Sequence, residues 1–436
     1  MINENFSIVE MDESMNSNRI FQILLDQIPK HVIYDQTTQK LFVCFERMGK
    51  GSMIKVIDPH TKKSVKDVFL KDKETVTCVT IWNLKSTKRY ICVGTKGYRD
   101  SNGIWGGRVL VYSLKLKSDK INYSLNQPGG YEFPHSVTAI KSYGPYLLVA
   151  SGRTLNQLKI DESARTIVLG ATIKLRSHTH SISTVEKYIF LGCIEDSICI
   201  YKAAFHEKKF IPITCDDIPH EIVDCIAFKQ TLHSHIIFSL NTYQCINGYR
   251  FDDQKSILIQ HLTFNLQEIC LKFSMANLST DIISSIENPI ELNDFDFHLD
   301  WDIKLPKKFI YCISNQGTLY KLTKLSSFIY TILIFIQDLL ELHPNTKPLL
   351  GGTLKSFRST PYQQYQNMID GLFIKQFCKL NESDRKSIMI HFNDWWVHVF
   401  QIKYRNSVLV GGEALLIKKD VVLATDVDVI IQRLES

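Results

Sequence analysis

The sequence predicts a mainly β fold, a single β-propeller of the seven-bladed, WD40-like type followed by a small helical C-terminal domain. Short runs rich in Val, Ile, Tyr and Phe, separated by Gly, Asn, Asp and Ser turns, recur from about residue 28 to residue 323, which is typical of strands. These runs come in pairs that repeat along the chain at the period of propeller blades. After Leu325 the apolar residues adopt helical spacing, which predicts the helical domain.

Six strand pairs share one pattern: a hydrophobic strand, a small or polar turn, and a second strand with an apolar residue near its end. They are KLFVCF with SMIKVID, YICVGT with GGRVLVYSL, PYLLVASG with TLNQLKI, YIFLGC with DSICIYKA, HIIFSLN with QCINGYRF, and FIYCIS with GTLYKL. Most steps between pairs are about 40 to 55 residues. A blade has two apolar faces that it cannot bury alone, so a ring of blades is expected. A β-sandwich or solenoid stays the alternative, because no WD dipeptide or Kelch signature marks the copies.

Three segments follow from this pattern: an N-terminal segment at 1–27 that could supply a closing strand, the propeller at 28–324, and the helical domain at 325–436. SSFIYTILIFIQDLLEL predicts a buried helix that ends before Pro344 and Pro348. IDGLFIKQFCKL and ATDVDVIIQRLE are further helix candidates, whereas WWVHVFQIKY and NSVLVGGEALLIKK alternate like strands. An acidic, aromatic insertion at about 275–305 is interpreted as a solvated loop rather than a docking surface for a basic partner.

The composition is that of a soluble globular protein, with 44% apolar residues, 22% charged residues and a net charge of +6. The longest apolar run, Phe328 to Ile336, is about half the roughly 20 residues that span a bilayer. The acidic N-terminus lacks a signal peptide's apolar core, which favours the cytosol or nucleus. Eleven cysteines without a CxxC pair disfavour a zinc ribbon or a disulfide framework. Most of these cysteines lie in apolar runs, where we expect buried thiols: Cys44, Cys78, Cys92, Cys193, Cys199, Cys225 and Cys312.

No local constellation for catalysis is present, because GxSxG, HExxH, Walker A and GxGxxG are all missing. GIWGGR leads into a strand and is interpreted as a blade turn. His178 and His180 have a spacing that zinc could use, but histidines in polar turns are mostly solvated. Asp216 and Asp217 are adjacent, so in a strand they would face opposite sides. We therefore expect no catalytic residue, no cofactor and no metal site. A lysine cluster at 62–73 is interpreted as a solvated blade edge that discourages aggregation rather than as a phosphate-binding surface.

Several segments resemble one known family. IPKHVIYDQTTQKLFV, IKVIDPHTKKSVKDVFL and the pair YICVGT with GGRVLVYSL look like blade segments of that family, and SFRS and NMIDGLFIKQF look like its tail motifs. The family comprises the large subunits of damaged-DNA-binding protein and of the cleavage/polyadenylation specificity factor, together with the third subunit of splicing factor 3b, and the resemblance is to its C-terminal region. The matched motif positions are Gly94, Thr95, Gly107, Arg108, Phe357, Arg358, Ser359, Ile369, Asp370 and Gly371. The chain departs from the family at Leu372, where an acidic residue is usual, and over 393–418.

The resemblance implies a non-enzymatic nuclear scaffold. Its expected partners are protein subunits of a multiprotein nuclear complex, with nucleic acid contacted directly or through those partners, and no membrane. Three branches stay open: a ubiquitin-ligase adaptor in DNA repair, splicing, and mRNA 3′-end processing. The resemblance also implies that the chain corresponds to the third of three propellers plus the tail. The alternatives are a β-propeller enzyme with its site at the central channel, and a truncated, non-functional gene fragment.

Overall fold

The structure is a computed structural model, which describes residues 5–11, 18–24, 28–47, 50–71, 73–85, 88–99, 103, 105–114, 126–161, 166–277, 308–322, 325, 327–346 and 352–391. The chain divides into two compact units. The first comprises Met1–His261 and Ile269–Lys272, and the second comprises Leu262–Glu268 and Phe273–Ser436.

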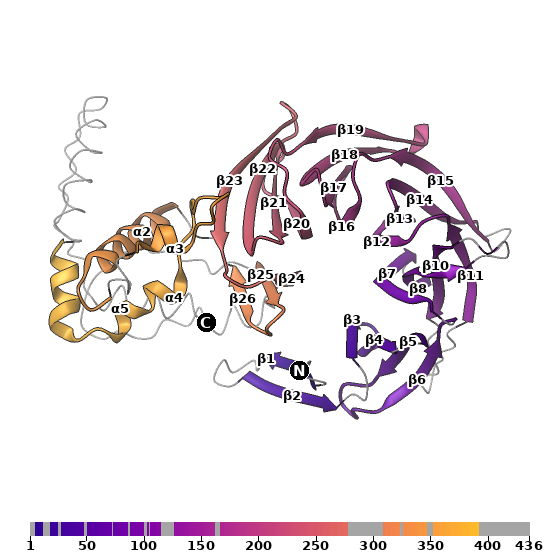
Figure 1. Cartoon of the computed structure of the whole chain (residues 1–436), viewed down its shortest axis with the longest axis horizontal. Helices are drawn as coiled ribbons and strands as arrows, with labels where there is room; N and C mark the ends of the chain where they lie inside the picture. Colours follow the sequence, from indigo (N-terminus) through magenta and orange to yellow (C-terminus); the bar gives the residue numbers. More distant parts are fainter. Residues whose placement is uncertain are drawn as a thin grey trace. The chain divides into compact units, whose positions relative to one another are not determined.

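Six of the seven antiparallel sheets formed by these residues contain strands that follow one another along the sequence, the arrangement of propeller blades (Figure 1). The first blade contains β3 (Ile28–Asp35), β4 (Lys40–Arg47), β5 (Lys50–Ile57) and β6 (Ser64–Phe69). The second contains β7 (Thr75–Lys85), β8 (Lys88–Lys96), β10 (Trp105–Leu114) and β11 (Asn126–Phe133), with the short β9 (Tyr98–Arg99) paired to β10. The third contains β12 (Val137–Tyr143), β13 (Tyr146–Ser151), β14 (Thr154–Asp161) and β15 (Thr166–Lys174).

The fourth blade contains β16 (Thr179–Val185), β17 (Tyr188–Cys193), β18 (Ile198–Ala204) and β19 (Lys209–Cys215), with the 3-10 helix η1 (Phe205–Glu207) before β19. The fifth contains β20 (Ile222–Lys229), β21 (Ser234–Asn241), β22 (Cys245–Asp252) and β23 (Ile257–Asn265). The sixth has three strands, β24 (Cys270–Asn277), β25 (Lys308–Ser314) and β26 (Leu319–Leu322). All six predicted strand pairs are confirmed, as β4/β5, β8/β10, β13/β14, β17/β18, β21/β22 and β25/β26.

The prediction of a seven-bladed ring is wrong, because the described residues supply six blades. The strands left over are β1 (Asn5–Met11) and β2 (Asn18–Leu24), which pair with each other in a two-stranded sheet. The expected domain bounds at 1–27, 28–324 and 325–436 stay a prediction.

Within the first unit, each seam between consecutive blades has a hydrophobic core of its own. Ile91 and Val93 of β8 pack with the first blade, whereas Cys92 between them packs with the third. This alternation follows from the period of two in a strand, which sends successive side chains to opposite faces. Middle strands are consequently buried on both faces, as β17 is at all six positions. The outermost strands, such as β6, are mostly exposed. Stacking the blades therefore buries apolar surface that a single sheet would leave in water.

The second unit contains the helical part of the chain. The predicted helix after Leu325 is confirmed as α2 (Ser327–Leu342). It is followed by α3 (Leu354–Phe357), α4 (Gly371–Ile374), α5 (Gln376–Lys379) and a helical segment at 382–391. Apolar residues of α2, including Ile332, Ile336 and Leu340, form one core with Phe373 and Phe377.

The predicted helix over IDGLFIKQFCKL is divided into two short helices, α4 and α5, by a turn at Lys375. The strand-like and helical candidates between residues 393 and 436 lie outside the described residues, as does most of the acidic insertion. Among the helices described, none has the length and apolarity needed to cross a bilayer.

Candidate functional site

Two of the predicted motif residues, Thr95 and Arg108, meet at a buried carboxylate in the second blade. The Arg108 guanidinium donates to both oxygens of Glu74, with Nε–Oε1 and Nη2–Oε2 distances of 2.7 Å. Thr95 Oγ1 donates to Glu74 Oε1 at 2.8 Å and accepts from the Arg108 backbone N–H at 3.2 Å. The ring of Tyr98 lies 4.5 Å from the guanidinium carbon, in cation–π geometry. A two-pronged, charge-assisted contact of this kind fixes the orientation of both strands that carry it.

Gly94 and Gly107 flank this cluster at positions where a side chain would collide with neighbouring atoms, side-chain atoms at Gly94 and backbone atoms at Gly107. A Cβ at Gly107 would lie 2.3 Å from the Thr95 carbonyl oxygen and 2.7 Å from the Val137 nitrogen. A Cβ at Gly94 would lie 2.5 Å from Cys78 Sγ. Glycine is therefore required at both positions for the second and third blades to pack. The four blade motif residues therefore lie close together and stabilise the packing of the second blade.

The tail motif residues Arg358 and Asp370 form a second buried ion pair, in the second unit. Arg358 Nε and Nη2 lie 2.7 and 2.6 Å from Asp370 Oδ2, and both side chains are almost fully buried. Arg358 Nη1 also donates to the Asn265 carbonyl oxygen at 3.2 Å, and the guanidinium carbon lies 4.7 Å from the centre of the Phe264 ring. Through these contacts the motif binds the tail to the segment at 262–268 of the same unit.

Asp370 caps helix α4 in addition to pairing with Arg358. Its Oδ1 accepts from the backbone N–H groups of Leu372 and Phe373 at 3.0 and 3.2 Å, which caps the helix. Its own N–H donates to Gln337 Oε1 of α2 at 2.9 Å. Gln337 Nε2 in turn donates to the Tyr365 hydroxyl at 3.0 Å. Burial raises the pKa of Tyr365 to about 12, so this phenol stays protonated at neutral pH.

The remaining motif positions play smaller parts. Ser359 Oγ accepts from the Tyr365 N–H at 2.8 Å and donates to the Lys355 carbonyl oxygen at 2.6 Å. Ile369 packs against the helical core. Phe357 is 52% exposed, and a Cβ at Gly371 would contact nothing within 4 Å. Glycine is therefore dispensable at 371 on steric grounds.

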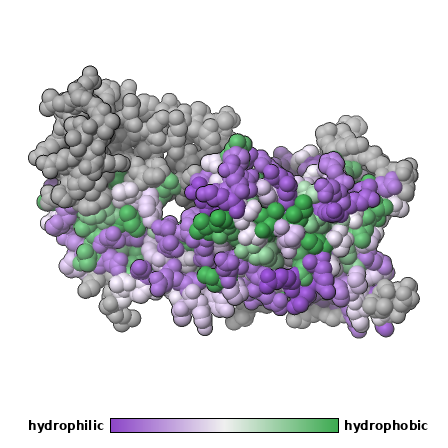
Figure 2. Space-filling view, turned by 90° about the horizontal axis from the view of Figure 1, so that it is seen from above, coloured by the Kyte–Doolittle hydropathy of each residue, from purple (hydrophilic) through white to green (hydrophobic). Residues whose placement is uncertain are grey.

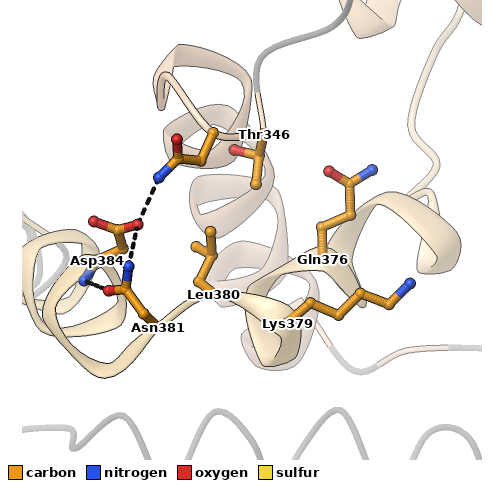
Figure 3. Close-up of a pocket in the computed structure, with 7 residues that line it drawn as sticks. Thr346, Gln376, Lys379, Leu380, Asn381 and Asp384 are labelled. Atoms are coloured by element: carbon orange, nitrogen blue, oxygen red, sulfur yellow. Dashed lines mark hydrogen bonds between the residues drawn. The ribbon is translucent and has the colours of Figure 1, made fainter.

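A polar hollow of about 490 Å³ lies in the helical part (Figure 3). Its acidic residue, Asp384, accepts from Asn345 Nδ2 at 2.7 Å and from Asn381 Nδ2 at 3.1 Å. Gln376 and Lys379 lie on the other side of the hollow (Figure 3). Because two amides already bind the carboxylate, the hollow resembles a capped helix start more than a catalytic cleft.

The exposed surface of the first unit carries apolar side chains on the outermost strands. Figure 2 shows hydrophobic residues among mainly hydrophilic ones on the side of the molecule that carries β19. The large apolar residues exposed on outermost strands are Val65 and Phe69 of β6, Leu169 of β15, Ile211 of β19, and Ile257 and Ile259 of β23. They are spread over four blades, and apolar residues scattered in this way are ordinary on protein surfaces.

The weaker sequence candidates are placed as follows. His178 precedes β16 and His180 lies on it with its side chain exposed. No group of three or more His, Cys, Asp or Glu that could hold a metal ion occurs in the described part of the chain. Asp216 follows β19 and accepts at 2.8 Å from the hydroxyl of Ser197, which precedes β18. The last four residues of GIWGGR, 105–108, belong to β10.

Sequence reasoning missed Glu74, the partner of Arg108, and two further contacts of Arg358, Phe264 and Asn265. Glu74 stands just before β7, and a lone acidic residue before an apolar strand gives no signal of burial. Phe264 and Asn265 are about 90 residues away from Arg358, so their contact with it depends on tertiary structure.

The comparison with family models matches residues 51–379 to the CPSF A subunit region. A search of curated proteins gave no match. Members of this family are generally scaffold subunits of multiprotein complexes and not enzymes. The matched range covers more than half of the chain and contains both motif clusters, and the blades that it spans form an interaction scaffold. The chain therefore belongs to the CPSF A subunit region family.

Proposed function

We propose that this chain is a non-enzymatic scaffold subunit of a multiprotein complex in the nucleus. The observation that carries the proposal is the family match, which runs from the first blade to α5. In that reading the chain corresponds to the C-terminal region of the longer family proteins. Its partners are other protein subunits, and nucleic acid is contacted directly or through them.

The buried polar groups support a structural rather than a catalytic use of the motifs. Arg108 pairs with Glu74, and Arg358 pairs with Asp370, each pair with little exposure to solvent. Charged groups that satisfy each other inside the fold are not available to bind a substrate. What the first unit offers to other molecules is its outer surface, including the exposed apolar side chains of β19 and β23.

Three nuclear roles compete for this scaffold: ubiquitin-ligase adaptor in DNA repair, splicing, and mRNA 3′-end processing. Different segments of the sequence resemble different branches of the family. The sequence SFRSTPYQQYQNMIDG is closer to the splicing branch, TVTCVTIWNL to polyadenylation, and ATDVDVIIQRLE to repair. The choice among the three depends on the partners.

The test is to tag the full chain in the cells that encode it, cross-link in place, and identify the cross-linked partners by mass spectrometry with nuclear and cytoplasmic fractions kept apart. We expect nuclear cross-links to subunits of one of the three machineries, and nuclease treatment separates contacts that require nucleic acid. A chain that cross-links to no nuclear protein, or that hydrolyses a substrate when purified, would overturn the proposal.

A matched pair of variants links the partners to the surface. I257D together with I259D places two charges on the outer strand β23, where both side chains are about half exposed, so the fold should survive while partner cross-links fall. K209D changes an exposed residue of the outer strand β19 and serves as the control. If both variants keep all partners, the β23 surface is not the contact.

A further inference from the structure

Three thiols converge in the fourth blade. Cys193 of β17 and Cys199 of β18 belong to the core at its seam with the third blade, and Cys215 of β19 packs against that core. The Cys199 thiol makes side-chain contacts with both of the other two. These three cysteines therefore form a sulfur cluster inside one sheet.

Cys199 and Cys215 face each other directly across two antiparallel strands. The Asp216 N–H donates to the Ile198 carbonyl oxygen at 2.8 Å, which makes 199 and 215 a non-hydrogen-bonded pair. In such pairs the Cα atoms lie about 4.5 Å apart and the side chains are closer than at hydrogen-bonded positions. A disulfide needs a Cα separation of roughly 4.4–6.8 Å, so the backbone already meets that requirement.

Cys193 is placed less favourably for a bond to Cys199. The residue opposite Cys199 on β17 is Leu191, so Cys193 is its diagonal neighbour, with a typical separation of about 7–8 Å between Cα atoms. Its sulfur also lies 3.7 Å from Thr179 Oγ1. The register therefore favours bonding of Cys199 to Cys215 over bonding to Cys193.

The two facing thiols differ in access and in acidity. Cys199 is buried at 3% exposure, whereas Cys215 is half-buried on the outermost strand of the blade. The hydrogen bond from the Cys199 thiol lowers the pKa of Cys215 to about 7, with help from the Arg176 guanidinium and against the opposing effects of burial and of the Asp196 and Asp216 carboxylates. The same sulfur contacts, to Cys193 and Cys215, raise the pKa of Cys199. Cys215 is thus the thiol that an oxidant reaches first, and Cys199 is the buried partner behind it.

We propose that Cys215 and Cys199 form a redox-reactive pair that a peroxide converts to a disulfide between β19 and β18. The Cys215 thiolate attacks one oxygen of hydrogen peroxide and becomes a sulfenic acid, and the departing hydroxide takes up a proton to leave as water. The Cys199 thiol then attacks the Cys215 sulfur, the S–S bond forms, and the hydroxyl leaves with the thiol proton as a second water. Two thiols and one peroxide give one disulfide and two waters. A small dithiol reverses the reaction by exchange. This inference does not depend on the scaffold role.

The test treats the reduced, full-length chain with a small excess of hydrogen peroxide and then blocks the remaining thiols by alkylation. Cleavage beside acidic residues is needed, because trypsin leaves Cys193 and Cys199 on one peptide and Cys215 and Cys225 on another. Glu195 and Asp196 separate the first two, and the acidic residues at 216, 217, 221 and 224 separate the second two. We expect a peptide pair joined through Cys199 and Cys215 that dithiothreitol releases.

Three variants test which cysteines form the bond. C215S should abolish the cross-link, while C193S should retain it. C378S replaces an exposed thiol of α5, far from the sulfur cluster in sequence, and should leave the cross-link unchanged. Thermal unfolding of each variant shows whether it folds. If C215S does not fold, the peptide map of the wild-type chain still shows which cysteines are joined. A dominant bond between Cys193 and Cys199, or oxidation confined to Cys378, would overturn the proposal.

Discussion

Replacing Arg358 by alanine should destabilise the second unit strongly, because it leaves a buried carboxylate without its counter-charge. Asp370 is almost fully buried beside Arg358. Its Oδ1 keeps two backbone N–H donors at the start of α4, but Oδ2 loses the guanidinium.

The size of the effect follows from the contacts that are lost. Removing one partner of a buried ion pair costs about 3–5 kcal/mol, and the two remaining donors place Asp370 near the lower end. The lost hydrogen bond to the Asn265 carbonyl adds about 1 kcal/mol, and the lost contact with the Phe264 ring adds about 0.5–1 kcal/mol. The expected cost is about 4.5–5 kcal/mol for R358A. R358K keeps a charge but cannot make the same forked contact, so it should cost about half as much.

Urea unfolding of the full chain, followed by amide hydrogen exchange over 354–379, measures this cost. D370N retains a good capping side chain, so the cycle of R358A, D370N and the double variant isolates the charge pair, with an expected coupling of about 1.5–3 kcal/mol. K355A, on the exposed side of α3, is the control and should cost less than about 0.5 kcal/mol. A loss below about 1 kcal/mol for R358A, or no coupling, would refute the reasoning.

Three further outcomes are expected from unfolding experiments. G107A should cost more than about 3 kcal/mol, because its Cβ would collide with backbone atoms, whereas G371A should lie within about 0.5 kcal/mol of the wild type or stabilise the short helix. T95V should cost about 1–3 kcal/mol, because it removes the hydroxyl that donates to the buried Glu74. Burial and the nearby lysines lower the pKa of His31 to about 4, while the unfolded chain binds the proton near pH 6.5. Stability should therefore fall as the pH drops from about 6.5 to about 4, by at most about 3 kcal/mol from this group, and H31F should flatten that slope.

Control variants distinguish these specific effects from a general loss of stability. H60Q changes a histidine in an exposed turn, so it should leave the pH slope as it is. An unaltered slope in H31F would show that other groups titrate in this range. Equal costs for G107A and G371A would contradict the steric argument, and a stable T95V would mean that Glu74 is satisfied without the hydroxyl.

The six strand pairs were predictable because each is local, with a short turn between two apolar runs. The number of blades was not, since the sequence shows six strand pairs and no seventh pair supported the expected seven-bladed ring. The helix α2 was predictable from its apolar run and following prolines, whereas the break at Lys375 depends on how α4 and α5 pack onto α2.

Of the candidate site, the sequence identified both members of the Arg358–Asp370 pair but only Arg108 of the Arg108–Glu74 pair. Arg108 and Arg358 stand in recognisable motifs, but Glu74 and Asn265 do not, because a buried partner is defined by the fold and not by its neighbours in the chain. The sequence does not distinguish the steric environment of Gly107 from that of Gly371. Only the surrounding atoms show that glycine is required at 107 and not at 371. The facing of Cys199 and Cys215 depends on the register of β18 and β19.

The one-core-per-seam arrangement has a consequence for synthesis. Within the first unit, each blade is completed by consecutive strands, and its first stacking partner is the blade made just before it. Most contacts therefore lie within one blade or join it to the adjacent blade, which limits the length of chain that must be closed to form them. As the chain leaves the ribosome, each newly formed sheet can pack against the apolar face of the preceding blade. The propeller can therefore fold in order from its first blade.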